Sequence, residues 1–160
     1  SHGNRGRATT DDGTATREAS DELTMAKRGS LEFVIRSLRD FTDLLVKKVV
    51  SDVVANLVAA PSEGGTPVDT GWARNNWIAQ IGSPVGKASG TRESPGTAGS
   101  KQQRALAAVI TGYTISKGRV FISNAVPYIV FLNEGSSKQA PASFVQRAIR
   151  KAVTTDLRAA

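Results

Sequence analysis

The stretch that decides the fold reads LEFVIRSLRDFTDLLVKKVVSDVVANLVAA and spans residues 31–60. Large apolar residues recur three or four positions apart along it, at Leu31, Val34, Leu38, Phe41, Leu45, Val49, Val53 and Leu57. This spacing places them on one face of a helix of about seven turns. Ser30 suits the N-cap of that helix, and Pro61 ends it just after residue 60. The sequence therefore predicts one long amphipathic helix.

Residues 1–29, which precede this helix, show no apolar periodicity. They are rich in Gly, Thr, Ser, Asp and Arg, a composition typical of segments that bury no core. We therefore expect a disordered N-terminal extension over residues 1–29 and a single domain over residues 30–160. The one methionine, Met25, suits a translation start, which would make residues 1–24 an added extension.

Beyond residue 60 the pattern predicts short elements separated by turns. A turn-rich linker at residues 61–71 ends at Asp69 and Thr70, either of which suits the cap of a short helical turn. Alternating apolar residues predict strands at 77–81 and 119–124. The remaining elements are a flexible Gly/Ser-rich loop at 82–103, a helix or strand (helix favoured) at 104–114, an apolar run at 128–132, and a closing helix at 141–157 with Pro141 in its first turn.

The predicted order of elements indicates the α+β class. We expect a small antiparallel sheet packed against the long N-terminal helix and the C-terminal helix. Trp77, at the start of the first predicted strand, is expected to be a buried anchor.

The residue types limit the chemistry that the chain can perform. The sequence has no cysteine, and its one histidine is His2, in the predicted extension. Disulfides, thiolate metal sites and Ser-His-Asp catalysis are therefore excluded. The glycines after residue 81 do not form a phosphate-binding loop. We expect a protein that is not an enzyme, with no catalytic, metal or cofactor site; the alternative is a carboxylate pair formed by Asp69 and Glu134.

The net charge of +7 comes from 21 basic and 14 acidic residues, and the excess is unevenly distributed. It lies in residues 82–104 and 136–160, whereas residues 31–60 carry equal numbers of each sign. A basic excess attracts nucleic acid or acidic surfaces, although it is also typical of an ordinary solvated surface. The eight charged residues within 31–60 exclude a membrane span there. The candidates for contact with DNA are Lys87, Arg92, Lys101 and Arg104.

Two segments, taken together and in this order, are more specific. The first reads TPVDTGWARNNW, residues 66–77, and the second reads ISNAVPYIVFLNEGSS, residues 122–137, followed by QAP at 139–141. Over residues 30–157 the chain resembles the small neck and tail-completion proteins of long-tailed bacteriophages. In that family a P-V-D-T-G-x-x-R-x-x-W motif follows the first long helix, and a second motif that opens on Asn-x-Val-Pro-Tyr leads to Gln-Ala-Pro and the closing helix. The matching positions are Pro67, Asp69, Thr70, Gly71, Arg74, Trp77, Asn124, Pro127, Tyr128, Glu134, Gly135 and Pro141.

The resemblance implies a structural role in the virion. Proteins of this family form rings, a hexamer by resemblance, at the junction of head and tail, where the genome passes through. Expected partners are copies of the chain itself, the neighbouring head–tail connector and the tail tube or terminator proteins, with non-specific contact to passing DNA. Assembly would take place in the bacterial cytoplasm. The sequence does not decide whether the subunit is a neck ring or a tail terminator. The alternative functions are a basic DNA-binding protein and a hydrolase that uses Asp69 and Glu134.

Overall fold

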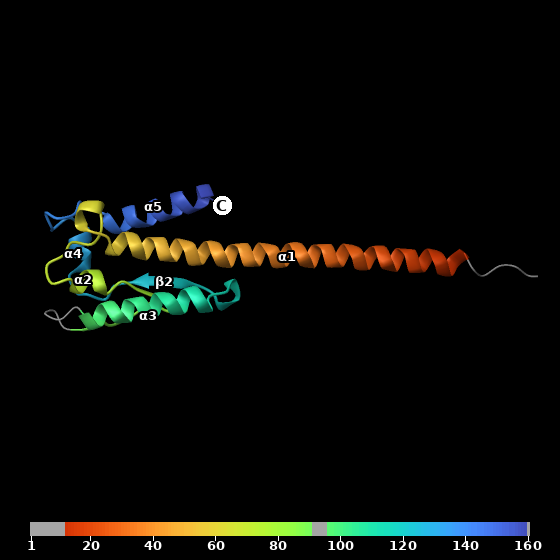
Figure 1. Ribbon diagram of the computed structural model, residues 1–160, viewed down its shortest axis with the longest axis horizontal. Coiled ribbons are helices and arrows are strands. Elements are labelled where there is room, and N and C mark those ends of the chain that lie inside the picture. Colours follow the sequence, from red (N-terminus) through yellow and green to blue (C-terminus); the bar gives the residue numbers. More distant parts are fainter. Residues whose placement is uncertain (1–11, 91–95, 160) are drawn as a thin grey trace, which may run out of the picture. The chain divides into compact units, whose positions relative to one another are not determined.

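The computed structural model describes residues 12–90 and 96–159 (Figure 1). Its elements, in chain order, are α1 (Asp12–Val58), α2 (Trp72–Asn75), β1 (Ile78–Ile81), α3 (Gly96–Gly112), β2 (Val120–Ser123), α4 (Ile129–Asn133) and α5 (Phe144–Ala159), with 3-10 turns at Pro61–Glu63 and Ile115–Lys117. Helices and a two-stranded antiparallel sheet confirm the α+β class, with a long N-terminal helix and a C-terminal helix.

The chain divides into two units, one ending at Arg39 and the other beginning at Asp40. In the first unit the structure corrects the expected disorder over residues 1–29, because residues 12–29 are helical; residues 1–11 lie outside the described part. Ser30 is not an N-cap, since its hydroxyl donates to the Ala26 carbonyl 3.1 Å away, as in a helix interior. The physical reason is that extending an existing helix costs far less than nucleating one.

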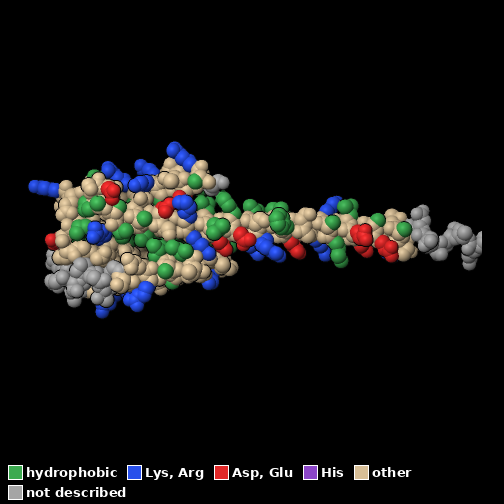
Figure 2. Space-filling model, in the orientation of Figure 1, with side chains coloured by type: hydrophobic (Ala, Val, Ile, Leu, Met, Phe, Trp, Pro, Cys, Tyr) green, Lys and Arg blue, Asp and Glu red, His purple; other side chains and the backbone are tan. Residues whose placement is uncertain are grey.

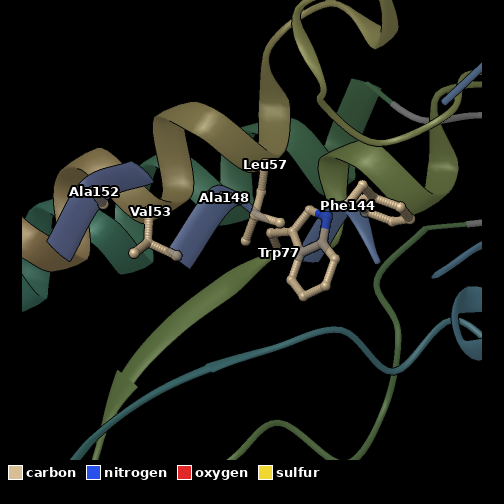
Figure 3. Close-up of a cluster of buried hydrophobic side chains, with 6 residues drawn as sticks. All are labelled: Val53, Leu57, Trp77, Phe144, Ala148 and Ala152. Atoms are coloured by element: carbon tan, nitrogen blue, oxygen red, sulfur yellow. The ribbon is translucent and has the colours of Figure 1, made fainter. Parts of the chain in front are cut away.

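In the second unit, the last turns of α1 are buried on two sides. Val53 and Leu57 belong to a cluster with Trp77, Phe144, Ala148 and Ala152, which joins α1 to α5 and to the start of β1 (Figure 3). A second cluster joins α1 to β1 and α3 through Val50, Val54, Ala79, Val109 and Tyr113. The predicted stripe named only the first of these two faces. Two adjacent valine pairs, 49–50 and 53–54, allow one helix to serve both clusters.

The two strands pair as an antiparallel ladder. Ile78 lies opposite Ser123 and Ile81 opposite Val120, and the Gly82 amide donates to the Arg119 carbonyl at 2.8 Å. Both strand predictions are therefore confirmed, with the strands slightly shorter than expected. The helix α3 packs on β1, and the helical interpretation of residues 104–114 is confirmed in most of its length.

Three boundaries differ from the expected ones. The predicted flexible loop at 82–103 is helical from Gly96, so α3 begins eight residues before Arg104. The apolar run at 128–132 is largely the short helix α4. The closing helix begins at Phe144 and not at Pro141, since the Asn133 side chain accepts a hydrogen bond from the Val145 amide and caps α5 at that point. Among the described residues, no helix combines the length and apolar character that crossing a membrane requires.

Replacing Gly65 by alanine should destabilise the protein strongly. A Cβ at this position would lie 2.1 Å from the backbone oxygen of Ala59, so the chain after α1 would have to move. We expect the free energy of unfolding in urea to fall by about 2 kcal/mol or more. The matched control is Gly86→Ala, where a Cβ meets nothing within 4 Å. Equal stability of the two variants would contradict the close approach of Gly65 to the Ala59 backbone.

Candidate functional site

The two sequence segments on which the resemblance rests, residues 66–77 and 122–141, meet in the structure. They enclose a small cavity of about 210 Å³, here called the motif junction. Its lining is drawn from both segments and consists of Pro67, Val68, Asp69, Gly71, Trp72, Ala73, Tyr128, Leu132, Ser137 and Gln139. Residues about sixty positions apart in the chain thus form one site, which the order of the motifs alone did not reveal.

The first segment is fixed by the end of α1. Thr66 is fully buried, and both its amide and its hydroxyl donate to the Leu57 carbonyl, at 2.9 and 2.7 Å. The indole N–H of Trp77 in turn donates to the Thr66 hydroxyl at 2.8 Å. A carbonyl left open at the helix terminus is thereby satisfied. The prediction that Trp77 is buried is confirmed, since only 5% of its surface is exposed.

The turn that follows explains the Asp-Thr-Gly part of the motif. Gly71 has φ +82°, in the left-handed region that side chains disfavour, and it precedes α2. The Thr70 hydroxyl accepts a hydrogen bond from the Trp72 amide at 3.3 Å, whereas Asp69 is exposed. The N-cap of α2 is thus Gly71, without a side-chain cap, and neither Asp69 nor Thr70 is the cap that the sequence predicted.

A buried asparagine that the motif analysis did not single out holds the next loop. Asn76 is 1% exposed; its side-chain oxygen accepts from the Ser89 amide at 2.6 Å, and its amide nitrogen donates to the Trp72 carbonyl at 2.9 Å. The Trp72 indole also donates to the Ser89 carbonyl, at 2.8 Å. Nothing local in the sequence signals these contacts, because Ser89 lies in a Gly/Ser-rich stretch without periodicity.

The second segment is joined to the first by three direct contacts. The Asn124 side chain donates to the Ala73 carbonyl at 2.7 Å. The Gln139 side-chain oxygen accepts from the Val68 amide at 2.8 Å. The rings of Trp72 and Tyr128 lie with centroids 6.0 Å apart at an angle of 55°, a favourable tilted arrangement. These contacts tie the linker after α1 to the approach to α5.

The remaining motif residues lie around the junction in structural positions. The Arg74 carbonyl accepts from the side chain of the buried Gln102 at 3.2 Å. Gly135, at φ +95°, ends α4, and a Cβ there would lie 3.1 Å from that of Ala142. Exposed positions are taken by Pro127, Glu134 and Pro141.

Asp69 and Glu134, the residues of the carboxylate-pair alternative, are both exposed. Within residues 12–90 and 96–159, no cluster of three or more His, Cys, Asp or Glu side chains could hold a metal ion.

The basic candidates for DNA contact are partly described. Lys87 and Lys101 line a second, larger cavity of about 790 Å³, between β1, the loop after it and α3. Arg104 is exposed on α3, and its Nε donates to the Ser100 carbonyl at 3.3 Å. Arg92 lies outside the described residues. The cavity lining otherwise consists of one glutamine and of apolar or small residues.

An ion pair between a half-exposed lysine and a buried aspartate links α1 to α5. The Asp156 side chain is fully buried, and its carboxylate lies 2.8 Å from Lys48 Nζ, which also binds Asp52 at 2.7 Å. Hydrogen bonding to Asp156 and then to Asp52 raises the pKa of Lys48 to about 12. The hydrogen bond from Lys48 lowers the pKa of Asp52 below its usual range. This group was not predicted, because Asp156 lies more than a hundred residues from Lys48 and Asp52.

Comparison with known proteins adds no relative: no protein-family model matches the chain, and no curated protein or solved structure shows significant similarity to it.

Replacing Asn76 by alanine should loosen the motif junction. The variant leaves the Ser89 amide and the Trp72 carbonyl without their side-chain partner. We expect the free energy of unfolding to fall by about 2 kcal/mol, as is typical when buried polar groups lose their partner. Gln103→Ala, at an exposed position of α3, is the control and should change stability by less than about 0.5 kcal/mol. Comparable losses in both variants would contradict the assigned role.

The ion pair should make stability depend on pH at both extremes. The folded pKa of Asp52 is lowered, so its contribution is present above 3.8 and is lost as the pH falls through the folded value. The folded pKa of Lys48 is raised, so its contribution is present below 10.5 and is lost as the pH rises through about 12. Thermal unfolding midpoints measured against pH should show both declines.

Two variants separate these declines. Asp52→Asn should reduce the loss of stability in acid. Lys48→Met should lower the midpoint at neutral pH, because it leaves the buried Asp156 carboxylate without its cation, and should shrink the alkaline decline. An unchanged alkaline decline in Lys48→Met would assign that decline to other groups.

Proposed function

We propose that this protein is a non-enzymatic structural subunit of a tailed bacteriophage. It forms a homo-oligomeric ring, a hexamer, at the junction of head and tail, where it completes the neck or the tail and lets the genome pass. The observation that carries the proposal is the motif junction, where the two segments that resemble the neck and tail-completion family meet around one cavity.

The character of the junction supports a structural role. Its volume of about 210 Å³ is below the usual range of small-molecule sites, roughly 300–1,000 Å³. The contacts across it join backbone groups to the side chains of Asn124 and Gln139, and the aromatic pair packs beside them. Such contacts fix the course of the chain between α1 and α5. We therefore assign the motif residues to folding and assembly.

The distribution of charge supports contact with DNA as a secondary property. The chain carries a net charge of +7, and Lys87, Lys101 and Arg104 are exposed. Neutralising phosphates with such side chains gives binding that does not depend on base sequence and that weakens with salt. The same feature favours the second candidate function, a basic DNA-binding protein.

In the proposed assembly the subunit meets copies of itself, the head–tail connector above or below it, and the tail tube or terminator. A closed ring requires head-to-tail contacts between unlike surfaces of one subunit. Neck ring and tail terminator are both compatible with the proposal.

The test is native mass spectrometry of the purified protein combined with quantitative mass spectrometry of purified phage particles. We expect a discrete homomeric ring, and a small, fixed number of copies per virion. A stable monomer that is missing from particles and binds duplex DNA with a steep salt dependence would overturn the proposal in favour of the DNA-binding alternative. A ring that never enters particles would also overturn it.

A further inference from the structure

The N-terminal part of α1 exposes large apolar side chains. Within the first unit, Leu31 is 60% exposed and Phe33 is 71% exposed, and Val34, Ile35 and Leu38 are exposed beside them. Figure 2 shows hydrophobic side chains exposed along this part of the helix. A contiguous exposed patch of this kind marks an interaction site in a soluble protein. The patch formed by these five residues is called here the apolar face of α1.

The spacing of the residues on this face indicates a helical partner. The intervals from Leu31 through Val34, Leu38 and Phe41 to Leu45 alternate between three and four, which averages 3.5 and is the repeat of a coiled-coil seam. After Leu45 every interval is four, and the later residues of the row pack in the protein's own core. The change of period therefore separates a part suited to another helix from a part suited to this domain.

The charges on α1 favour an identical partner. Those between residues 31 and 45 lie on the side opposite the seam, with both signs present: Glu32, Arg36, Arg39, Asp40 and Asp43. The absence of a basic excess there disfavours phosphate as a partner. The positions that flank a coiled-coil seam usually carry charges that select the partner. Here they are filled by uncharged residues, so two identical seams meet without like-charge repulsion: Ser30, Ile35, Ser37, Thr42 and Leu44.

The apolar surface is also wider than the seam of a two-stranded coiled coil. Leu44, which is 66% exposed, flanks the seam on one side, and Ile35 flanks it on the other. Phe33, which is 71% exposed, lies beyond Leu44 on the same side, farther from the seam. A helix that is apolar over so much of its circumference is suited to neighbours on two sides.

We infer that residues 31–45 of α1 pack against the same segment of other copies of this chain. In the proposed ring this segment has a neighbour on each of its two sides, so each contact joins unlike flanks of the segment. The inference rests on the proposed function only for the number of copies. Self-association through α1 does not depend on whether the assembly is located at the head–tail junction.

Cysteine cross-linking tests the contact directly, because the full chain has no cysteine of its own. In Val34→Cys the single thiol lies on the seam, and in the control Arg36→Cys it lies on the opposite side of the same helix turn. Under mild oxidation with copper phenanthroline, we expect Val34→Cys to form a disulfide-linked dimer at least tenfold faster than Arg36→Cys. Equal rates would overturn the inference.

A second variant tests the energetic role of the face. Val34→Asp places a charge on the seam, and we expect sedimentation velocity to show that association needs at least tenfold more protein. Arg36→Gln should associate as the unchanged chain does. Fluorescence of Trp72 and Trp77, both in the second unit, reports whether that domain stays folded in each variant. Unchanged association of folded Val34→Asp would overturn the inference.

The outcomes separate this inference from the proposed function. If the Val34→Asp variant still forms the ring and enters phage particles, the inference is wrong and the proposed function stands. A monomeric wild-type chain whose residues 31–45 are protected from hydrogen exchange means that the chain covers its own face, and overturns the inference. Binding to vesicles of anionic phospholipid that Val34→Asp abolishes, without self-association, overturns it as well.

Discussion

The burial of the last turns of α1 on two sides is the constraint on which the rest of the second unit depends. Val53 and Leu57 face α5 and Trp77, while Val50 and Val54 face β1 and α3. Burying each of these side chains contributes about 1.5–3 kcal/mol, so the four together outweigh any single polar contact nearby. Because one helix serves both clusters, neither the sheet with α3 nor the C-terminal helix can shift without disturbing the other.

The end of this helix also sets the starting point of the motif junction. The Leu57 carbonyl is bound by Thr66, and Thr66 is bound by Trp77, so the linker, the helix end and the start of β1 are joined by one chain of hydrogen bonds. From that fixed point, Gly71 and Thr70 set the turn into α2, and Asn124 and Gln139 bring the second segment against it. The motif residues thus act by directing the backbone, which explains why the pattern combines Pro, Gly and amide side chains.

What the sequence could predict follows from how local the responsible interactions are. The long helix, the two strands and the burial of Trp77 come from periodicity and residue type within a few positions, and these predictions are confirmed. The start of α1, the early start of α3 and the cap of α5 by Asn133 were missed. Each of these depends on an existing helix or on a partner elsewhere in the chain.

The site shows the same division. Its members were found from the two motifs, but their meeting around one cavity, the role of Asn76 and the Lys48–Asp156 ion pair required the structure. A buried carboxylate that is paired across more than a hundred residues leaves no periodic pattern. Its cost of desolvation is repaid only by a cation that the fold brings to it. Sequence periodicity predicts which face of a helix or strand is buried, but it does not predict which other element packs against that face.

The distribution of charge suggests that, in the proposed assembly, one segment serves self-association and other segments serve contact with DNA. The helix segment with the exposed seam carries charges of both signs on its opposite side, whereas the basic excess lies in residues 82–104 and 136–160. Association through a charge-balanced apolar helix is little weakened by salt, because it rests on burial and not on attraction between opposite charges. The proposed contact of the basic segments with DNA would weaken with salt, more steeply the more phosphates it neutralised. Self-association that rests on burial, together with DNA contact that does not depend on base sequence, would let a ring hold its shape while the genome moves past it.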